Sequence, residues 1–228
     1  LVSEDRLRAD ITTNAEFGAV PTDRGHGRTV LTGTNANRLA REYLVDRLKA
    51  AGLDVRVDAV GNIVGRWVPE RADPTLPAVA CGSHLDSVPE GGIFDGVLGV
   101  YSGLEAIRAL QGTDRELARP IEVVCFTEEE GGRFSNGVLG SSVASGNRSV
   151  EEALALEDDA GVTLETALTD IGFRGTDRVD ASAWDSWLEL HVEQGERLQN
   201  AGAAVGVVSA IPGTIRCSID IVGEADHS

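Results

Sequence analysis

The sequence predicts an α/β fold in which helices layer a mainly parallel, mixed β-sheet. Three observations lead to this prediction: short apolar runs bounded by turn residues, helical patterns of about 15 residues between them, and the alternation of the two along the chain. Strands joined through helices run parallel, and the helices then cover the faces of the sheet. With 228 residues, 42% of them hydrophobic, the chain can form one sizeable core.

The first clear helix is predicted within residues 32–52, which close with Gly52. Thr34 or Asn35 is suited to cap its N-terminus, because a side-chain oxygen there can accept a free main-chain N–H. The apolar face of this helix is formed by residues at helical spacing, namely Leu39, Tyr43, Leu44 and Leu48.

Three further segments read as strands. Residues 53–67 alternate and turn at Gly61-Asn62, which predicts a hairpin. The apolar runs 77–83 and 120–127 are short and bounded by turn residues, so each suits a buried central strand. A helix between the last two strands would make them parallel neighbours.

Residues 96–111 supply that helix, with Gly112 placed as its C-terminal cap. One face of this segment is apolar: Val97, Val100, Leu104, Ile107 and Leu110. Farther along, Ser149–Glu152 has the form of a capping box and predicts a short helix. Residues 187–195, WLELHVEQG, predict a strand that runs into a loop.

The C-terminal segment 204–228 reads as consecutive strands and predicts the entry to a second domain near Pro212-Gly213. The expected organisation is therefore one domain over 1–212 and the start of another over 213–228. The chain contains no methionine, and the sequence stops at IVGEADHS, inside a predicted strand and loop. We therefore expect the chain to be an N-terminal fragment of a longer protein.

The chain is strongly acidic, with 37 acidic and 20 basic residues and a net charge of −17. This balance excludes nucleic acid as the expected partner, because phosphate binding needs a basic surface. Lys49 is the single lysine. Two explanations stay open: adaptation to high salt, which screens charge repulsion, or an ordinary acidic enzyme from a GC-rich genome. Equal stability in low and molar KCl would remove the first.

No apolar run is long enough to span a membrane, and the charged N-terminus has no signal-peptide core, so the expected location is the cytoplasm. The cysteines Cys81, Cys125 and Cys217 show no CxxC spacing. Such an odd, scattered set is typical of buried free thiols in a reducing compartment.

Polar residues that carry chemistry follow the first buried strand, in GSHLDSVPEGGIFDG. His84 ends this strand, Asp86 comes two residues later, and Asp95 follows a Gly-Gly loop that can fold back toward His84. Imidazole and carboxylate are ordinary zinc ligands, and Asp86 is suited to orient the His84 ring. A polar surface turn with a structural histidine would carry the same residues, so this segment alone leaves both readings open.

A second cluster, CFTEEEGGRF, ends the other buried strand with three adjacent glutamates. Alternate side chains of an extended segment point opposite ways, so a metal ligand and a neighbouring general base require a turn, which Gly131-Gly132 permits. A solvated acidic strand end is the alternative. ELHVEQG, with His191 and Gln194, and GEADHS, with His227, are weak signals when each is taken alone.

The four clusters together are more specific than any one of them. Histidine and carboxylate at several strand ends of an α/β chain is the composition of a hydrolytic dinuclear metal site. Other chemistries find no support: GGIFDGVLG does not fit a dinucleotide-binding loop, and the chain has no P-loop, nucleophile elbow or papain-like cysteine.

GSHLDSVPEGGIFDGVLGV, FTEEEGGRF, ELHVEQG and GEADHS resemble, in order and spacing, the motifs of the amidase/hydantoinase/carbamoylase family. That family belongs to the zinc aminoacylase and carboxypeptidase superfamily and includes N-carbamoyl-L-amino-acid hydrolases, β-ureidopropionases and allantoate amidohydrolases. The resemblance runs from about residue 30 to the end. It implies a zinc-exopeptidase-like catalytic domain over 1–212 and the beginning of a lid and dimerisation domain over 213–228.

For the metal site, the resemblance implies two divalent ions, zinc or manganese, in the full-length subunit. His84 and His191 would bind one ion, Asp95 would bridge to the second, and Glu130 would bind the second. A further histidine of the family's second site lies beyond the present chain. The second site would thus be incomplete and the isolated chain poorly active, with the longer parent a homodimer.

For catalysis, the resemblance implies that Glu129 is the general base, that Asp86 orients His84, and that Gln194 contacts the amide or carbamoyl group of the substrate. His227 would bind substrate and stabilise the oxyanion. The expected reaction is hydrolysis of C–N bonds in linear amides, first of all N-carbamoyl-L-amino acids. Three alternatives remain: an allantoate amidohydrolase, an aminoacylase or exopeptidase, and a non-catalytic metal-binding protein.

Overall fold

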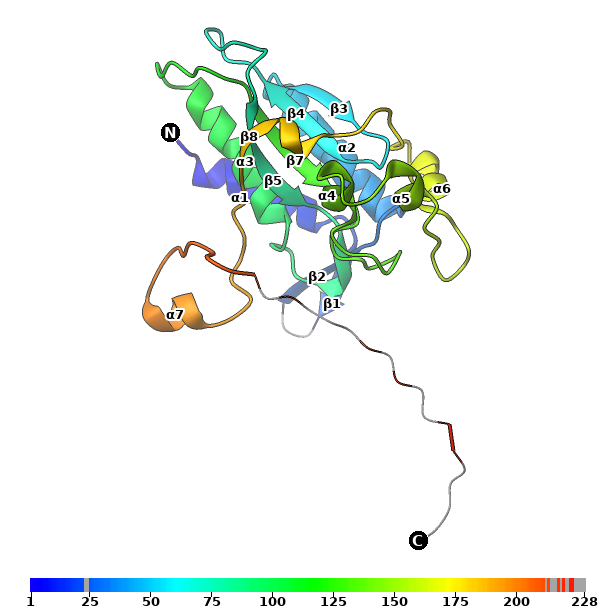
Figure 1. The fold of residues 1–228 in the computed structure, drawn as a ribbon. Helices are drawn as coiled ribbons and strands as arrows, with labels where there is room; N and C mark the ends of the chain where they lie inside the picture. Colours follow the sequence, from blue (N-terminus) through cyan, green and yellow to red (C-terminus); the bar gives the residue numbers. More distant parts are fainter. Residues whose placement is uncertain (23–24, 212, 214–216, 218, 220–221, 224–228) are drawn as a thin grey trace. The chain divides into compact units, whose positions relative to one another are not determined.

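The computed structural model describes residues 1–22, 25–211, 213, 217, 219 and 222–223. The chain divides into two compact units, Leu1–Val192 and Glu193–Ser228. The first unit contains the sheet and the long helices (Figure 1). This division does not test the domain boundary expected at residue 212, which stays a prediction.

A five-stranded sheet forms the centre of the first unit, in the order β3-β4-β7-β5-β8. β5 runs parallel to β7 and β8, whereas β4 runs antiparallel to β3 and β7. The predicted α/β fold with a mixed sheet is therefore confirmed. The strands are β3 (Asp54–Val57), β4 (Ile63–Trp67), β5 (Ala78–His84), β7 (Ile121–Phe126) and β8 (Trp184–Leu188).

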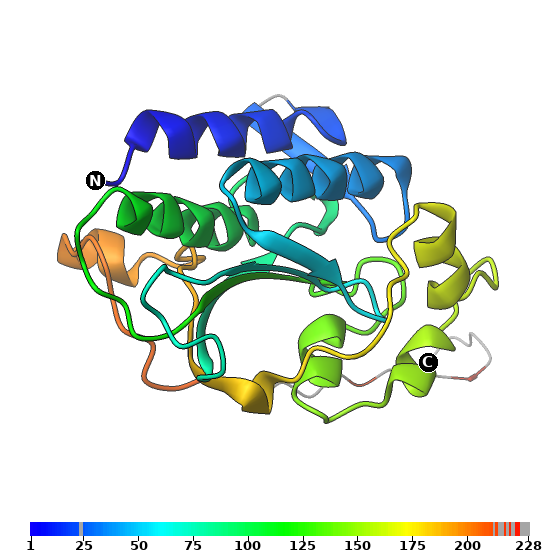
Figure 2. The same ribbon diagram turned by 90° about the horizontal axis from the view of Figure 1, so that it is seen from above.

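The three longest helices lie on the same side of this sheet: two pack against it, and the third packs on the outside of these two (Figure 2). Thr34 caps one of them by accepting the N–H of Asn37 at 3.3 Å. The helix over residues 97–111 lies close to β5 at Gly103, where a larger residue would not fit: an added Cβ would lie 2.8 Å from Cys81 Sγ. These helices are α1 (Glu4–Ala15), α2 (Asn35–Ala50) and α3 (Val97–Gln111).

Apolar side chains of the central strands are buried on both faces of the sheet. In β7, Val123 and Cys125 pack in the cluster beneath the helices, whereas Val124 and Phe126 pack on the opposite face. Trp184 and Trp187 cover part of that second face. Full burial of a branched or aromatic side chain contributes about 1.5–3 kcal/mol, so a strand buried on both sides needs the continuous apolar run seen in the sequence.

Besides α1, two groups contain elements that were not predicted from the sequence. One is an antiparallel sheet of β1 (Ala19–Thr22), β2 (Gly25–Val30) and β6 (Ser87–Gly91), in the order β1-β2-β6. The other comprises short helices after β7. Among these, α5 begins with the predicted capping box, in which the side chains and main-chain N–H groups of Ser149 and Glu152 bond reciprocally. The short helices are α4 (Leu139–Ala144), α5 (Val150–Leu154), α6 (Leu164–Asp170) and the 3-10 turn Ala181–Ala183.

The second unit contains a short helix, α7 (Arg197–Ala201), whose first N–H groups bond to Glu193 Oε1 at 2.8 and 3.0 Å. The strands expected over 204–228 are not found among the described residues of that range. A strand requires a neighbouring strand as hydrogen-bonding partner, which β-branched residues alone do not supply.

In the described part of the chain, no helix combines the length and apolar character needed to cross a bilayer.

The three cysteines differ in exposure, and we expect them to differ in reactivity. Burial raises the pKa of Cys125 to about 12 and that of Cys81 to about 11, whereas Cys217 is exposed. Because the thiolate is the reactive form, a disulfide reagent should modify Cys217 in the folded protein and the other two only after unfolding. Rapid reaction of all three in the folded state would contradict this prediction.

The same shifts predict a loss of stability in alkali. The ordinary thiol pKa is 9.0, below both folded values, so the unfolded chain loses its thiol protons first. The free energy of unfolding contributed by Cys81 and Cys125 is thus complete below pH 9 and falls as pH rises toward 11–12. Urea unfolding between pH 8 and 11 measures this decline, and replacing both cysteines by alanine should reduce it.

Candidate metal centre

His84, the last residue of β5, lies at the centre of the candidate site and is only 2% exposed. Its Nδ1 atom is 3.1 Å from the main-chain oxygen of Asp86. A carbonyl oxygen can only accept, so this contact makes Nδ1 the donor and leaves the lone pair on Nε2. Nε2 faces two carboxylates, with Glu129 Oε2 at 3.4 Å and Asp95 Oδ1 at 3.8 Å.

The loop between β5 and α3 returns Asp95 to His84. Within this loop β6 pairs with β2, so that its path is fixed by main-chain hydrogen bonds. The loop then ends at Gly96, which has a φ of +68° and lies against the His84 ring. A Cβ at this position would come within 2.5–2.6 Å of three ring atoms, and therefore only glycine fits here.

The three adjacent glutamates point in different directions because the chain turns at Glu128, which has a φ of +51°. Glu128 is buried, and its Oε1 accepts the N–H groups of Arg133 at 2.9 Å and Phe134 at 2.8 Å. Glu129 and Glu130 are partly exposed. The turn expected at Gly131-Gly132 thus begins three residues earlier, and Glu128 has a structural role.

Buried polar groups hold this acidic turn from behind. Asn62 Oδ1 accepts the N–H of Thr127 at 3.0 Å, and Arg41 donates to the Thr127 hydroxyl at 3.0 Å. On the other side, Val138 N–H donates to the carbonyl of Glu129 at 2.7 Å. These bonds fix the main chain on both sides of the two partly exposed glutamates.

His191 reaches the same region from the third parallel strand. β8 ends at Leu188, so His191 lies three residues beyond the strand and not at its end as expected. Its Nε2 is 3.1 Å from Asp95 Oδ1. Nearby, Glu189 Oε1 accepts a hydrogen bond from the Ser83 hydroxyl at 2.5 Å, which ties this segment to β5. Parallel strands end at one edge of a sheet, which explains how residues more than 100 positions apart meet.

The donor set suits a divalent metal ion. His84 offers a ring nitrogen, and Asp95 and Glu130 each offer a carboxylate oxygen. These three atoms lie within 4.8 Å of one another. Imidazole nitrogen and carboxylate oxygen are ligands that zinc and manganese accept. Burial raises the pKa of both Glu129 and Glu130, and the carboxylates of Asp86 and Asp95 raise it further while His84 lowers it. A bound cation would offset this crowding of negative charge.

Asp86 contacts the centre through two groups. Its carboxylate Oδ2 accepts the N–H of Glu130 at 3.0 Å and thereby connects the loop after β5 to the acidic turn. Oδ1 is 3.6 Å from His84 Nδ1 and has no hydrogen-bond partner among the described residues. The main-chain oxygen of Asp86, at 3.1 Å, is thus the closer partner of the imidazole.

The structure brings six of the predicted residues together: His84, Asp86, Asp95, Glu129, Glu130 and His191. Gln194 belongs to the second unit, and His227 lies outside the described residues. Sequence reasoning missed Glu189, although it precedes His191 by two residues and alternate residues of an extended segment share a side. It also missed Gly96 and Asn62, for which no pattern in the sequence gives a signal.

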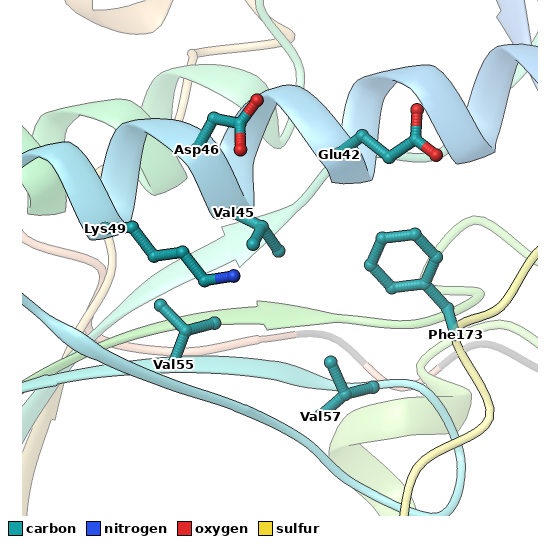
Figure 3. Close-up of a pocket in the computed structure, with 7 residues that line it drawn as sticks. All are labelled: Glu42, Val45, Asp46, Lys49, Val55, Val57 and Phe173. Atoms are coloured by element: carbon teal, nitrogen blue, oxygen red, sulfur yellow. The ribbon is translucent and has the colours of Figure 1, made fainter.

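A separate surface pocket of about 440 Å³ shares no residue with this centre. It lies between α2 and β3, where Figure 3 shows the single lysine, Lys49, near Val45 and Val55. Its acidic residues, Glu42 and Asp46, are both on α2, and the strand-end carboxylates do not contribute to it. The pocket therefore offers no arrangement comparable to the histidine–carboxylate cluster.

Known proteins resemble this chain in sequence and in fold. An N-carbamoyl-L-amino-acid amidohydrolase of Paenarthrobacter aurescens is 40% identical over 98% of this chain and 54% of its own length. A ureidoglycolate hydrolase of Arabidopsis thaliana is 37% identical over 86% of this chain and 42% of its own. The crystal structure of a hydantoinase/carbamoylase family amidase from Burkholderia ambifaria superposes with a TM-score of 0.81 at 41% identity, covering 88% of this chain and 48% of that one.

The mixed sheet, its helical layer and the cluster at its carboxyl edge are those of an M20 peptidase-like α/β domain. The chain belongs to peptidase family M20/M25/M40, whose family model matches residues 80–227. The predicted resemblance to the hydantoinase/carbamoylase amidases is confirmed by the relatives above. The chain spans about half the length of the curated relatives it matches.

Proposed function

We propose that the chain forms the metal-binding part of a hydrolase that cleaves C–N bonds of linear amides, with N-carbamoyl-L-amino acids as substrates. One observation carries the proposal. The possible ligand atoms of His84, Asp95 and Glu130 converge within 4.8 Å, and the Glu129 carboxylate lies 3.4 Å from the same imidazole. A metal-dependent hydrolase requires a ligand set and, beside it, a carboxylate that is not a ligand and can act as the general base. Glu129 has this position, and a protein that only carries a metal has no need of such a base.

The proposed division of labour assigns the metal ions to His84, Asp95, Glu130 and His191. When bound, divalent ions in such a site act as Lewis acids that make a water molecule more acidic and polarise a carbonyl group. Glu129 then accepts the proton of the attacking water and transfers it to the leaving nitrogen. The zinc or manganese identity of the ions, and a total of two per subunit of the whole protein, belong to this proposal.

Asp86 has a positioning role in this scheme. Its main-chain oxygen fixes the His84 ring, and its carboxylate fixes the Glu130 main chain. One residue therefore sets the relative position of two proposed ligands from neighbouring strands. Gln194 and His227 are proposed to contact the amide and the developing oxyanion, and residues 213–228 to begin a lid domain through which the whole protein dimerises.

N-carbamoyl amino acids are proposed ahead of other ureido acids because the amidohydrolase relative matches at 40% identity over nearly the entire chain. The ureidoglycolate hydrolase matches at 37% over a smaller part. Both names describe substrates with a ureido group, so the shared chemistry supports that class. Allantoate is the second candidate, as a ureido acid of the same kind.

The proposal is tested with the whole protein that contains these residues, incubated with zinc or manganese and one substrate at a time. We expect release of free amino acid from N-carbamoyl-L-amino acids, loss of this activity with a chelator, and its return with added metal. Allantoate, an N-acyl amino acid and a dipeptide form the comparison set. A higher kcat/KM for the dipeptide would identify an exopeptidase, and no turnover of any substrate would favour a non-catalytic metal-binding protein.

A further inference from the structure

Arg28 is a fully buried arginine behind the candidate metal centre, on the inner side of the small sheet. It lies on β2, and its side chain is 0% exposed. One terminal nitrogen donates to Asn14 Oδ1 at 2.7 Å. The other donates to the main-chain oxygen of Leu85 at 2.8 Å and lies 3.4 Å from that of Asp86.

These contacts link Arg28 to the central histidine through a shared hydrogen-bond acceptor. The main-chain oxygen of Asp86 accepts from Arg28 and also from His84 Nδ1, at 3.4 and 3.1 Å. Carbonyl oxygens have two lone pairs, so both donors can be accommodated. The guanidinium therefore contacts the carbonyl groups of the two residues that directly follow His84.

A buried cation without an ion-pair partner lowers the stability of the fold. Arg28 has no carboxylate within 4.0 Å in the described part of the chain, and its Nε has no hydrogen-bond partner there. Burial lowers the pKa of Arg28, and the charge of Asp86 opposes that shift. Apolar residues of similar volume often replace buried charges without loss of stability, so stability alone does not explain this arginine.

We propose that Arg28 is a positioning residue for the metal centre: it holds the 85–86 peptide groups so that the Asp86 oxygen keeps His84 protonated on Nδ1 and directs Nε2 to the metal. This inference rests on the proposed function only for the identity of the metal site. The orientation of the imidazole belongs to the metal-free chain. Arg28 contacts neither substrate nor metal in this account and acts through His84.

The test measures the tautomer of His84 and the zinc affinity separately. Long-range ¹⁵N–¹H spectra of the metal-free protein at pH 8 should show the neutral His84 ring protonated on Nδ1. In Arg28→Met this preference should be lost, and zinc affinity, measured by competition with a chelating dye, should fall about 10- to 100-fold, as is usual for groups that orient a metal ligand. Arg28→Lys, which keeps a charge at this position, should show the same direction of change, because a lysine ammonium does not reproduce the position of the guanidinium nitrogen that donates to the carbonyls of residues 85 and 86.

Asn14→Ala is the matched control, since it removes the bond between Arg28 and α1 but leaves the bonds to residues 85 and 86. It should lower the melting temperature without changing the tautomer or the zinc affinity. An unchanged tautomer in both Arg28 variants, or tighter zinc binding after removal of the positive charge, would overturn the inference. A wild-type protein with the expected tautomer but no zinc uptake would refute the proposed metal site and leave the positioning role intact.

Discussion

Replacing Glu129 by glutamine is expected to abolish turnover by the whole protein while leaving its metal content unchanged. The Glu129 carboxylate lies 3.4 Å from His84 Nε2, at the centre of the cluster, but three other residues form the convergent ligand set. Glutamine preserves the size of the side chain and removes only its basicity. A general base contributes about 10²–10⁴-fold to the rate, so kcat should fall by at least that range. Amino-acid release and elemental analysis measure the two effects.

The neighbouring glutamates provide matched controls on the same turn. Glu130→Gln should lower metal content, because it alters a proposed ligand. Glu128→Ala should lower the melting temperature, because the buried N–H of Phe134 and the part-buried N–H of Arg133 lose their acceptor, at a cost of about 1–3 kcal/mol for the buried group. Unchanged turnover in Glu129→Gln would refute the assignment of the base, whatever the controls show.

Replacing Gly96 by alanine is expected to remove tight metal binding with the smallest covalent change the chain allows. The added methyl group would lie 2.5–2.6 Å from three atoms of the His84 ring, a separation at which the ring has to move. Gly96 also has a φ of +68°, which L-residues adopt only with strain. Because Asp95 precedes it and His84 packs against it, two proposed ligands are displaced together. Zinc affinity should fall by at least about 100-fold, since metal sites tolerate only small displacements of their ligands.

Gly92→Ala is the control for this change, because a Cβ there meets no atom within 4 Å although it belongs to the same loop. Its zinc affinity should equal that of the wild type. Circular dichroism of both variants separates loss of the site from loss of the fold. Wild-type zinc affinity in a folded Gly96→Ala protein would show that His84 is not a ligand in the position described.

The central sheet could be predicted from the sequence because its strands are buried on both faces. β5 and β7 each contain a short, nearly continuous apolar run, which is the pattern typical of a strand buried on both faces. α1 could not be predicted in this way, because its buried side includes Asp10 and Asn14, which bond to Arg108 and Arg28. Hydrophobic periodicity does not register a helix that packs through polar contacts.

β6 shows a different limit of sequence reasoning. It contains Pro89 and a residue with positive φ, Glu90, and it is largely exposed, so it lacks the alternation typical of a strand. Its partner, β2, is distant in the sequence. The opposite error occurs over residues 204–228, where β-branched residues suggested strands that the described residues do not form.

The candidate site could be predicted to the extent that its residues stand at strand ends. His84 and the acidic turn follow apolar runs directly, so their meeting at one edge of the sheet follows from parallel strand order. The supporting groups could not be foreseen, since Arg28, Arg41 and Asn62 are single polar residues whose partners lie far away in the chain. Their function depends on tertiary contacts that leave no local pattern.

The most direct test of the metal centre is the metal content of the protein, measured by elemental analysis after purification without chelators. We expect at least one tightly held zinc or manganese ion per chain, and its loss in a folded His84→Ala variant, because His84 is the imidazole on which the ligand set converges. A folded wild-type protein that contains no such ion, and takes up none when zinc or manganese is added, would contradict this expectation.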